Sequence, residues 1–363
     1  MHEAGANHSA EGRSFREYGW EKKHLNNRAW RSAANMRVLA QIGAALKLYM
    51  VGLKVLLYQL FHRPFASPVL PVQCGKVAIV TGGARGLGYE VARQLTGLGM
   101  HVIIASRNEK QGLAAVKRLR EERSGAQVDF EFLDLASMDS VRRFVRRFED
   151  RRLPLHTLIN NAAVMLVPEG KTEDGFEQHF AVNYLGHFLL TRLLLGVLVR
   201  SGTTKACSRI ISICSAAHYT ADTDLQDLRS MRHYSPYAAY SRSKLAQVLF
   251  TYQLQQELQS GGFAVTANAV DPGMVDTDLY RNLSTPAWLA QRPIARLLFR
   301  TASQAAGTAV FTVASPELEG VGGCYLYEGK RVQSSAASYD AELQARLWRS
   351  SCDLLGLPES ELA

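Results

Sequence analysis

A glycine-rich turn constrains the fold of this chain more than any other feature. Residues 81–88 read Thr-Gly-Gly-Ala-Arg-Gly-Leu-Gly, directly after a β-branched run at 76–80 and directly before a helix-length segment at 87–98. Glycine allows a positive φ angle and a close backbone approach, and the N-terminus of the following helix offers free N–H groups to an anion. A purely structural turn is the alternative. We predict a strand, turn and helix that bind a pyrophosphate through Thr81, Gly82, Gly86, Leu87 and Gly88.

The same alternation of strand and helix continues along the chain. Short apolar runs lie at residues 101–105, 128–133, 155–160, 209–214 and 263–270, each separated from the next by helix-length sequence. Strands that alternate with helices form βαβ units and a parallel sheet. We therefore expect an α/β fold: a Rossmann-type, doubly wound parallel sheet of about seven strands with helices on both faces.

An apolar segment precedes this fold at residues 37–62. About 20 apolar residues suffice to span a bilayer. Lys47 and Lys54 interrupt the segment two helical turns apart, so both leave a helix on nearly the same side, and a helix lying flat in the interface is as compatible as a spanning one. We predict a membrane-anchoring helix, between a polar extension at 1–36 and a proline-containing linker at 63–75.

Charge and cysteine usage narrow the class of protein. Residues 1–63 hold ten Lys and Arg and four Asp and Glu, so this stretch supplies six of the nine net positive charges. The distribution argues against a nucleic-acid-binding surface on the body and favours a basic arm near a membrane, or a solvated tail. The five cysteines show no CxxC pair and no metal-ligand spacing. They predict reduced thiols, no metal site, and a cytosol-facing enzyme better than a secreted one.

A tyrosine and a lysine four residues apart carry the predicted chemistry. Tyr240 and Lys244 share a helix face, so the ammonium can stabilise the phenolate and lower a pKa that starts at about 10. The same spacing recurs at Tyr18 and Lys22, so spacing alone does not decide. Ser215, at the end of the predicted strand before Tyr240, can donate a hydrogen bond to a reacting oxygen. We predict Tyr240 as the acid and base.

The end of the second predicted strand indicates the cofactor. A dinucleotide fold usually places an acidic residue there to hold the ribose hydroxyls of NAD. Here Arg107 stands at that position, and it can pair with a 2′-phosphate with assistance from Arg85 in the glycine turn. NADP(H) is therefore favoured, although Glu109 keeps NAD(H) open and Arg107 as a solvated surface residue is the alternative.

Together these motifs resemble the short-chain dehydrogenase/reductase family. The resemblance rests on the glycine turn, Asn-Asn-Ala at 160–162, Asn183, Ser215 and Tyr240-x-x-x-Lys244, in the family's order and spacing. It extends over roughly residues 76–327, and we assign a catalytic domain to 76–330 and a C-terminal helical extension to 331–363.

The resemblance also implies a role for each matching residue. Tyr240 is expected to be the acid and base, Ser215 to orient the substrate oxygen, and Lys244 to hold the nicotinamide ribose. Asn183 would complete a proton relay through water. The remaining cofactor contacts are expected from Asp134 at the adenine, from Asn161, and from Pro272, Gly273 and Thr277 near the nicotinamide.

Some positions depart from the family pattern. Ala163 replaces a common glycine, and Asp271 stands where many retinol-type members have histidine or asparagine. Together with residues 179–190, residues 315–323 and the apolar segment at 37–62, Asp271-Pro272-Gly273 is most similar to members that interconvert polyprenol and polyprenal or dolichal and dolichol. The resemblance then implies an apolar lipid substrate and an endoplasmic reticulum membrane or lipid droplet location, with homo-oligomerisation open. Retinol or steroid oxidation, a catalytically silent cofactor-binding regulator and a secreted protein are the alternatives.

A basic segment is predicted to cover the substrate site. At about residues 276–300, Arg292, Arg296 and Arg300 recur every four residues and would line one helix face, opposite apolar residues that include Trp288 and Phe299. Such a lid can rest on a bilayer and admit substrate from it, or simply pack against the body. The sequence does not separate these two alternatives.

Overall fold

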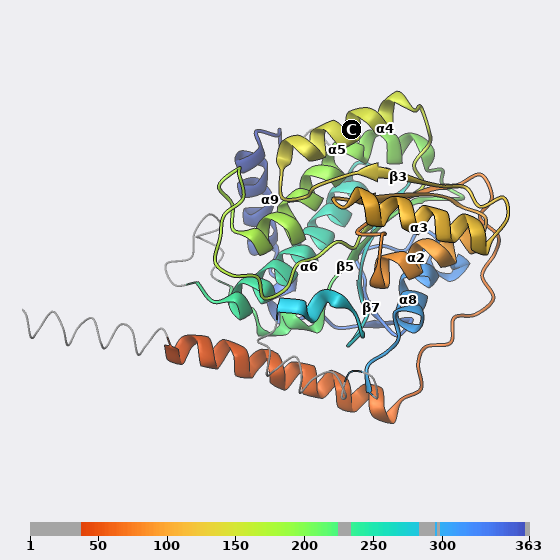
Figure 1. The fold of residues 1–363 in the computed structure, drawn as a ribbon. Helices are drawn as coiled ribbons and strands as arrows, with labels where there is room; N and C mark the ends of the chain where they lie inside the picture. Colours follow the sequence, from red (N-terminus) through yellow and green to blue (C-terminus); the bar gives the residue numbers. More distant parts are fainter. Residues whose placement is uncertain (1–37, 224–233, 283–294, 296–297, 360–363) are drawn as a thin grey trace, which may run out of the picture.

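The computed structural model describes residues 38–223, 234–282, 295 and 298–359. Within them, eight strands form one sheet in the order β3-β2-β1-β4-β5-β6-β7-β8 (Figure 1). Strands β1 to β7 pair in parallel, and β8 is antiparallel to β7. Their bounds are β1 Val77–Thr81, β2 His101–Ser106, β3 Val128–Phe132, β4 Thr157–Asn160, β5 Ser208–Ile213, β6 Val265–Asp271, β7 Tyr325–Tyr327 and β8 Lys330–Val332.

The predicted Rossmann-type sheet is confirmed, with one added edge strand. A two-residue turn, Glu328 and Gly329, joins β7 to β8, and both residues have positive φ angles of 49° and 71°. Such a turn suits a tight hairpin. The short polar strand β8 was not predicted, because it lacks the apolar pattern that identified the others.

Helices cover both faces of the sheet. They are α2 Gly86–Gly97, α3 Glu109–Glu122, α4 Met138–Asp150, α5 Gly186–Ser201, α6 Pro236–Ser260, α8 Ala302–Ala314 and α9 Ala341–Leu355. One hydrophobic cluster joins the sheet to α2, α3 and α8, and the other joins it to α4, α5, α6 and α9. The central strands are therefore buried on both sides, as the fully buried β1 shows.

Side-chain caps define where several helices begin. The Asn108 side chain accepts from the backbone N–H of Gln111 at the start of α3. Ser137 and Asp340 do the same for α4 and α9. Each cap satisfies an N–H group that has no partner within the helix, a contribution of about 1 kcal/mol. Helix α2 begins differently, because the side chain of its N-cap residue Arg85 makes no such bond.

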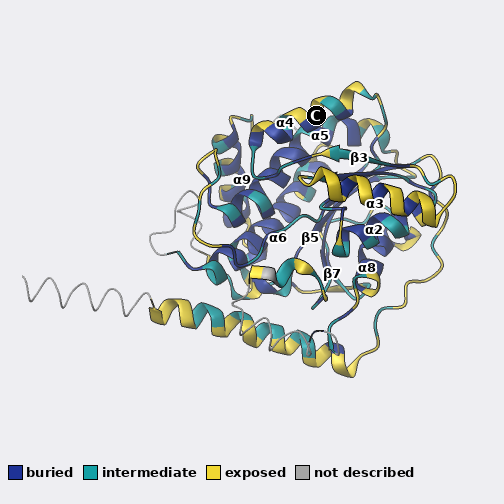
Figure 2. Ribbon diagram, viewed as in Figure 1, coloured by how far each residue is buried: buried dark blue, intermediate teal, exposed yellow. Residues whose placement is uncertain are grey.

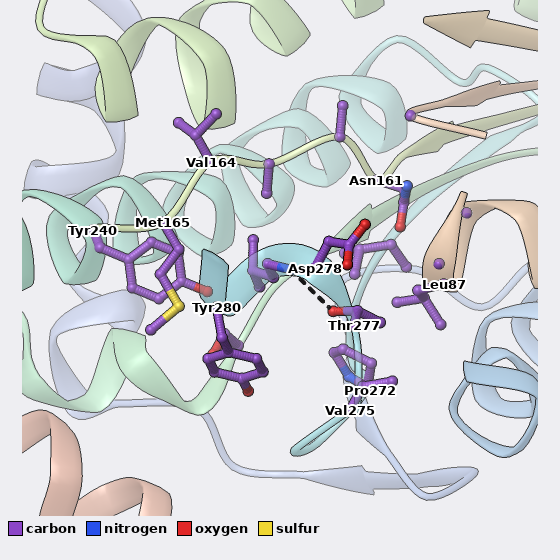
Figure 3. A pocket seen from close by; sticks show the side chains of 18 of the residues that line it. Leu87, Asn161, Val164, Met165, Tyr240, Pro272, Val275, Thr277, Asp278 and Tyr280 are labelled. Atoms are coloured by element: carbon purple, nitrogen blue, oxygen red, sulfur yellow. Dashed lines mark hydrogen bonds between the residues drawn. The ribbon is translucent and has the colours of Figure 1, made fainter. Parts of the chain in front are cut away.

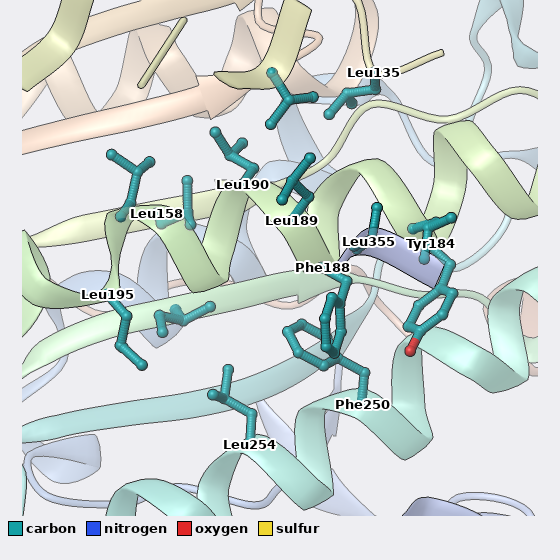
Figure 4. Packing of buried hydrophobic residues seen from close by; sticks show 14 of the residues in the cluster. Leu135, Leu158, Tyr184, Phe188, Leu189, Leu190, Leu195, Phe250, Leu254 and Leu355 are labelled. Carbon is teal, nitrogen blue, oxygen red and sulfur yellow. The ribbon is translucent and has the colours of Figure 1, made fainter. Parts of the chain in front are cut away.

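Helix α5 belongs to the core although it is apolar enough to cross a membrane. The apolar helical stretch Phe180–Ser201 passes a length and composition test for a membrane span, but 78% of its most apolar window is buried. Phe188 lies against Phe250 of α6 with ring centroids 5.2 Å apart (Figure 4). A helix that is apolar on all sides is expected in a protein core, and we assign α5 there.

The C-terminal helix α9 completes the same core. Trp348 packs edge-on against Phe188 at 5.2 Å, and the hydroxyls of Tyr184 and Ser351 lie 2.6 Å apart. Burying one large apolar side chain contributes about 1.5–3 kcal/mol. The predicted C-terminal extension is thus helical and packs into the main body.

The apolar segment before the body forms one helix, Val38–Phe61. It is long and apolar enough to cross a membrane, by length and composition. It lies lengthwise along the body in Figure 1, where it is the orange-red helix. Figure 2 shows exposed and partly buried residues alternating along it, and its exposed large residues include Leu46, Met50, Leu53 and Leu57. One face of the helix therefore contacts the body while the other is an uncovered apolar surface.

Candidate active site

A large cavity of about 1120 Å³ lies at the carboxyl ends of the parallel strands. Its lining includes the glycine turn after β1, Arg107 after β2, Ser215 after β5 and the segment after β6. Figure 3 shows Leu87 and Asn161 at one end, with Tyr240 and Met165 at the other. In open α/β sheets ligands bind at this edge, where the strand order reverses. Here the reversal falls between β1 and β4.

The glycine turn has the geometry that an anion site requires. Gly82 and Gly86 have φ angles of +65° and +56°, a conformation that favours glycine. A Cβ on Gly88 would stand 2.4 Å from Nδ2 of Asn161, so no side chain fits there. Because α2 has no side-chain cap, its first N–H groups remain for a phosphate, whose charge the helix dipole also favours.

Thr81 and Asn161 hold this turn in place. The Thr81 hydroxyl oxygen accepts from the N–H groups of Asn161 and Ala162 at 2.8 and 3.0 Å. In return, Nδ2 of Asn161 donates to the Thr81 carbonyl at 2.7 Å. Both side chains are therefore occupied in bracing the turn, although Asn161 also lines the cavity. Thr81 is fully buried, so its contribution to cofactor binding stays a prediction.

His187 contacts the glycine turn through the Thr81 side chain. The sequence analysis did not identify this residue. Its Nε2 lies 2.9 Å from the Thr81 hydroxyl, and its Nδ1 lies 3.1 Å from the Asn183 carbonyl. Burial lowers the pKa of His187 to about 4, so the ring is neutral at physiological pH. Its position one helical turn after Asn183 was the available signal.

Tyr240 and Ser215 meet inside the cavity. Tyr240 projects from α6 and is only 3% exposed, and it lines the cavity together with Ser215, which follows β5. Burial raises the pKa of Tyr240, and the nearby Ser215 side chain offsets part of that effect. The phenol is therefore protonated at neutral pH, which is the form that can donate a proton to a carbonyl oxygen.

Lys244 lies one helical turn after Tyr240, but its ammonium group bonds to other residues. Nζ donates to the Ile213 carbonyl at 3.0 Å and to Oε1 of Gln247 at 2.8 Å, and it is 5.9 Å from the centroid of the Tyr240 ring. Burial lowers the pKa of Lys244 to about 8. Burial raises the pKa of Tyr240 in this structure, and the lowering of that pKa by Lys244 stays a prediction.

The side chain of Asn183 braces the wall of the cavity. It lies in a π-helical turn, η1 (Phe180–Leu185), and is fully buried. Its Oδ1 accepts from the N–H of Val164 at 2.8 Å, while Nδ2 donates to the Val164 carbonyl and to Ser243 at 3.0 and 2.9 Å. Since Ser243 precedes Lys244, the amide ties the loop at Val164 to helix α6. The proton relay through Asn183 stays a prediction.

The residues predicted to bind the adenosine end also line the cavity. Arg107 is exposed at the end of β2 and lines the cavity with Asp134, whose carboxylate accepts from the N–H of Ala136 at 3.0 Å. Arg85 lines the cavity too, but its guanidinium pairs with Asp278 at 3.1 Å. Arg107 is thus the better placed of the two arginines to meet a 2′-phosphate.

The segment after β6 closes the cavity. Asp271 is buried, and its carboxylate accepts from the Tyr325 hydroxyl at 2.8 Å and the Gly273 N–H at 2.9 Å. Burial raises the pKa of this carboxyl group. Thr277 reaches the glycine turn, because its Cγ2 lies 3.4 Å from the place that a Cβ on Gly86 would take. Pro272, Gly273 and Thr277 all line the cavity.

The predicted lid falls largely outside the described residues, including Trp288, Arg292 and Arg296. Arg300, the last arginine assigned to the lid, was expected on an exposed face and is buried instead. Arg300 is only 8% exposed, and its guanidinium pairs with Glu328 at 3.1 Å and donates to the His62 carbonyl at 2.8 Å. Arg300 is therefore not part of an exposed basic face, because the partly buried carboxylate of Glu328 and the His62 carbonyl hold its guanidinium inward.

Sequence reasoning also missed that the helix Val38–Phe61 forms a wall of the cavity. Gly52 and Val55 are among its lining residues, and buried Gln59 bonds to the backbone of Met274. The available signal was Gly52 and Gln59 within a largely apolar run.

Comparisons with known proteins agree with this geometry. A family model described as short chain dehydrogenase matches residues 76–288. Polyprenol dehydrogenase of Danio rerio is 57% identical over 88% of this chain and 99% of its own. Retinol dehydrogenase 12 of Mus musculus is 40% identical, with 78% of this chain and 87% of the relative covered.

Solved structures show the same fold. An uncharacterized protein from Mycobacterium paratuberculosis aligns with a TM-score of 0.66 at 31% identity, over 82% of this chain and 100% of that one. Gluconate 5-dehydrogenase from Burkholderia cenocepacia, in complex with NADP and tartrate, aligns with a TM-score of 0.53 at 26% identity, over 70% and 94%. Its sequence motifs, its fold and its sequence similarity to known members show that the chain belongs to the short-chain dehydrogenase family.

Proposed function

We propose that this protein interconverts a polyisoprenoid alcohol and its aldehyde at a membrane, with a nicotinamide cofactor. The observation that carries the proposal is the cavity itself, which joins a phosphate-binding turn and a buried acid/base tyrosine to the wall of an apolar helix. The 57% identity to polyprenol dehydrogenase of Danio rerio supports a polyisoprenoid over other lipids.

A nicotinamide dinucleotide fits the residues present. The positive φ angles at Gly82 and Gly86 and the uncapped start of α2 suit its pyrophosphate, and Ser215, Tyr240 and Lys244 lie at the other end of the cavity. When bound, the cofactor supplies or accepts the hydride. Cavities of about 300–1,000 Å³ hold small-molecule ligands, so the volume here leaves space for a substrate as well.

The protein's own groups would handle the proton. In reduction the Tyr240 phenol donates a proton to the carbonyl oxygen, while the Ser215 hydroxyl holds that oxygen by a hydrogen bond. In oxidation the phenolate takes the proton back. Lys244, fixed by Ile213 and Gln247, presents a positive charge beside the same site.

NADP(H) is the proposed cofactor in preference to NAD(H). Arg107 is exposed, lines the cavity and follows β2, the place where a 2′-phosphate would lie. A guanidinium binds phosphate through paired, charge-assisted hydrogen bonds. The gluconate 5-dehydrogenase structure, which contains NADP, supports a nicotinamide cofactor in this fold.

We propose that the helix Val38–Phe61 lies flat in the membrane interface, at the endoplasmic reticulum or a lipid droplet. Near its start, Nε2 of Gln41 donates to the Tyr234 carbonyl, and just past its end the His62 carbonyl accepts from Arg300. Because the body contacts both ends, the helix lies along it with its outer leucines uncovered. Lys47 and Lys54 are exposed, so both can reach headgroups.

The test uses the purified full chain and its Tyr240→Phe variant. Each is incubated with polyprenol, dolichal, retinol and a steroid alcohol, with NAD(H) and with NADP(H). We expect the highest kcat/KM on polyprenol or dolichal, abolished by Tyr240→Phe. Retinol is the second candidate, favoured by the 40% identity to retinol dehydrogenase 12. Highest turnover on retinol would replace the polyisoprenoid assignment, and no turnover of any substrate would indicate a cofactor-binding regulator.

A further inference from the structure

The cavity continues beyond the catalytic tyrosine to the helix Val38–Phe61. Leu48, Val51, Gly52, Val55 and Leu56 line it from one side. These residues recur every three or four positions, so they form a single inner face of the helix. The rest of the body contributes further apolar lining residues opposite them, among which are Met165, Leu166, Tyr280 and Phe299. This end of the cavity is thus apolar on both sides.

The helix is fastened to the loop that closes the active site. Oε1 of Gln59 accepts from the Met274 N–H at 3.2 Å, and Nε2 of Gln59 donates to the Met274 carbonyl at 3.4 Å. Gln59 is only 3% exposed. A Cβ on the neighbouring Gly273 would stand 2.9 Å from this amide, so the glycine gives the glutamine its space. An amide paired on both sides fixes the helix to the backbone two residues after Pro272.

A second contact joins the helix to the catalytic helix α6. The Tyr49 ring lies against the Tyr237 ring, with centroids 6.2 Å apart. Tyr237 lies three residues before Tyr240 and lines the cavity. The inner face of the helix therefore has a fixed position relative to the reacting groups.

Gly52 lines the cavity where the helix Val38–Phe61 faces Met274. A Cβ at Gly52 would lie 3.9 Å from Sδ and Cε of Met274, so any longer side chain would enter the space toward Met274. Met274 is itself held by the Tyr280 hydroxyl, 3.7 Å from its sulfur. Gly52 and Met274 therefore pack closely, with room for no side chain larger than a methyl group.

The edge of the wall meets the outer apolar surface. Tyr49 and Leu53 both line the cavity and are each 51% exposed. Leu53 adjoins the exposed Met50 and Leu57 on the outer face of the helix, one turn to either side. A continuous apolar path therefore leads from the outer surface, around this edge, to the inner face.

We infer that the inner face of the helix Val38–Phe61 is the binding wall for the apolar chain of the substrate, with its entrance at Tyr49 and Leu53. The chain lies along this inner face beside Gly52 and Met274, while its oxygen reaches Ser215 and Tyr240. This assignment rests on the proposed function and deepens it, because the helix then selects substrates by the length of their chain as well as attaching the protein to a lipid surface.

The test compares Gly52→Leu with a matched variant, Gly43→Leu, in the full chain. Gly43 lies on the same helix, and a Cβ there would meet nothing within 4 Å. Leucine is a better helix former than glycine, so neither change should unfold the helix. Geraniol, geranylgeraniol and a long polyprenol serve as substrates, and kcat and KM are measured separately for each.

Gly52→Leu is expected to raise KM for the long polyprenol about tenfold, and to raise KM for geraniol several times less, because a short alcohol needs little of the wall. Gly43→Leu should match the wild type on all three substrates. The inference would be overturned if Gly52→Leu raised KM equally for geraniol and polyprenol, or if it left kcat and KM for polyprenol unchanged.

A second pair of variants tests the fastening. Gln59→Leu removes both hydrogen bonds to Met274, whereas Gln41→Leu removes an exposed bond to Tyr234. We expect Gln59→Leu alone to speed hydrogen exchange at Met274 and to raise KM for polyprenol more than for geraniol. Unchanged exchange and unchanged KM would count against the helix as a wall.

The two proposals fail in different ways. If the wild type oxidises geranylgeraniol or retinol but not polyprenol, the polyisoprenoid assignment fails. The inference is then still decided by Gly52→Leu, through the ratio of its KM for the longest substrate accepted to its KM for geraniol. If polyprenol is oxidised and Gly52→Leu leaves its KM unchanged, the function stands and the wall is refuted.

Discussion

Ser215 and Tyr240 line the same cavity, and burial keeps the Tyr240 phenol protonated. A carbonyl oxygen bound between these two side chains would meet one hydroxyl donor from each residue. The pair is therefore arranged for proton donation, and the reverse reaction needs the less abundant phenolate.

The first prediction concerns pH. Since the pKa of Tyr240 is raised, kcat/KM for alcohol oxidation should increase steadily with pH above neutrality, while kcat/KM for aldehyde reduction stays level there. Tyr240→Phe should lower both by about 10²–10⁴-fold. Tyr252→Phe, on the same helix but bonded to Ser334, is the control and should keep wild-type profiles. A level oxidation profile would argue against the phenolate as base.

The second prediction concerns the stability cost of Lys244. The pKa of Lys244 is about 8 in the folded protein and 10.5 in the unfolded chain. The buried charge therefore lowers the free energy of unfolding by its full amount below about pH 8, and this destabilisation disappears as the pH rises to 10.5. Lys244→Met should raise the free energy of unfolding by about 1–2 kcal/mol at neutral pH, after allowance for two lost hydrogen bonds. The gain should shrink at alkaline pH, while turnover falls throughout.

Exposed Lys117 on α3 provides the matched control for Lys244. Lys117→Met should change stability by less than about 0.5 kcal/mol at every pH. Denaturant unfolding at several pH values measures both variants. A stabilisation by Lys244→Met that is the same at every pH would contradict the assigned cause.

The third prediction separates two roles of Asn183. Asn183→Leu leaves the N–H and carbonyl of Val164 without partners, and it should lower the free energy of unfolding by about 2–4 kcal/mol. If the residue also served a proton relay, the solvent isotope effect on kcat would change in variants that remain folded. Asn183→Asp, which keeps only the acceptor toward Val164, is the milder variant for that measurement. An unchanged melting temperature would refute the bracing role.

The fourth prediction concerns cofactor choice. Arg107→Ala should raise KM for NADPH about 10–100-fold, the worth of a charge-assisted pair, and change KM for NADH little. Arg85→Ala should have a smaller effect on NADPH, since Arg85 already pairs with Asp278. Steady-state kinetics with both cofactors provide the check. Equal changes with NADPH and NADH would remove Arg107 from the 2′-phosphate site.

The fifth prediction concerns membrane attachment. Met50→Glu combined with Leu57→Glu places two carboxylates on the exposed outer face of the helix. We expect the double variant to stay in the supernatant when anionic lipid vesicles are sedimented, whereas the wild type sediments. Leu113→Glu on α3, where the leucine is also about half exposed, is the control. Sedimentation of the double variant would show that the helix is not the attachment site.

The strands and the glycine turn could be predicted because their signals are local. A β-branched run before a glycine-rich turn needs no distant partner to be recognised, and β1 lies where the run predicted it. The eighth strand lacked such a run. Its one signal was Glu328-Gly329, a turn whose positive φ angles become informative only once β7 is known.

The remaining features depend on contacts between distant segments. Gln59 meets Met274 across 215 positions of sequence, and nothing near either residue indicates the other. Likewise, the Tyr240 and Lys244 spacing predicts a shared helix face, but the sign of the tyrosine pKa shift depends on burial by the whole fold. Asn183 was identified as a motif residue, whereas its partner Val164 was not.

Helix α9 has a consequence for how the protein is made. Trp348 follows Phe188 and Phe250 in the chain, yet it completes their aromatic cluster. The core on that side of the sheet therefore cannot close until α9 has been synthesised, long after the helix Val38–Phe61 has left the ribosome. If that helix attaches to a lipid surface as proposed, it can do so before the catalytic architecture is complete. A premature stop before residue 341 would leave those rings exposed to aggregation.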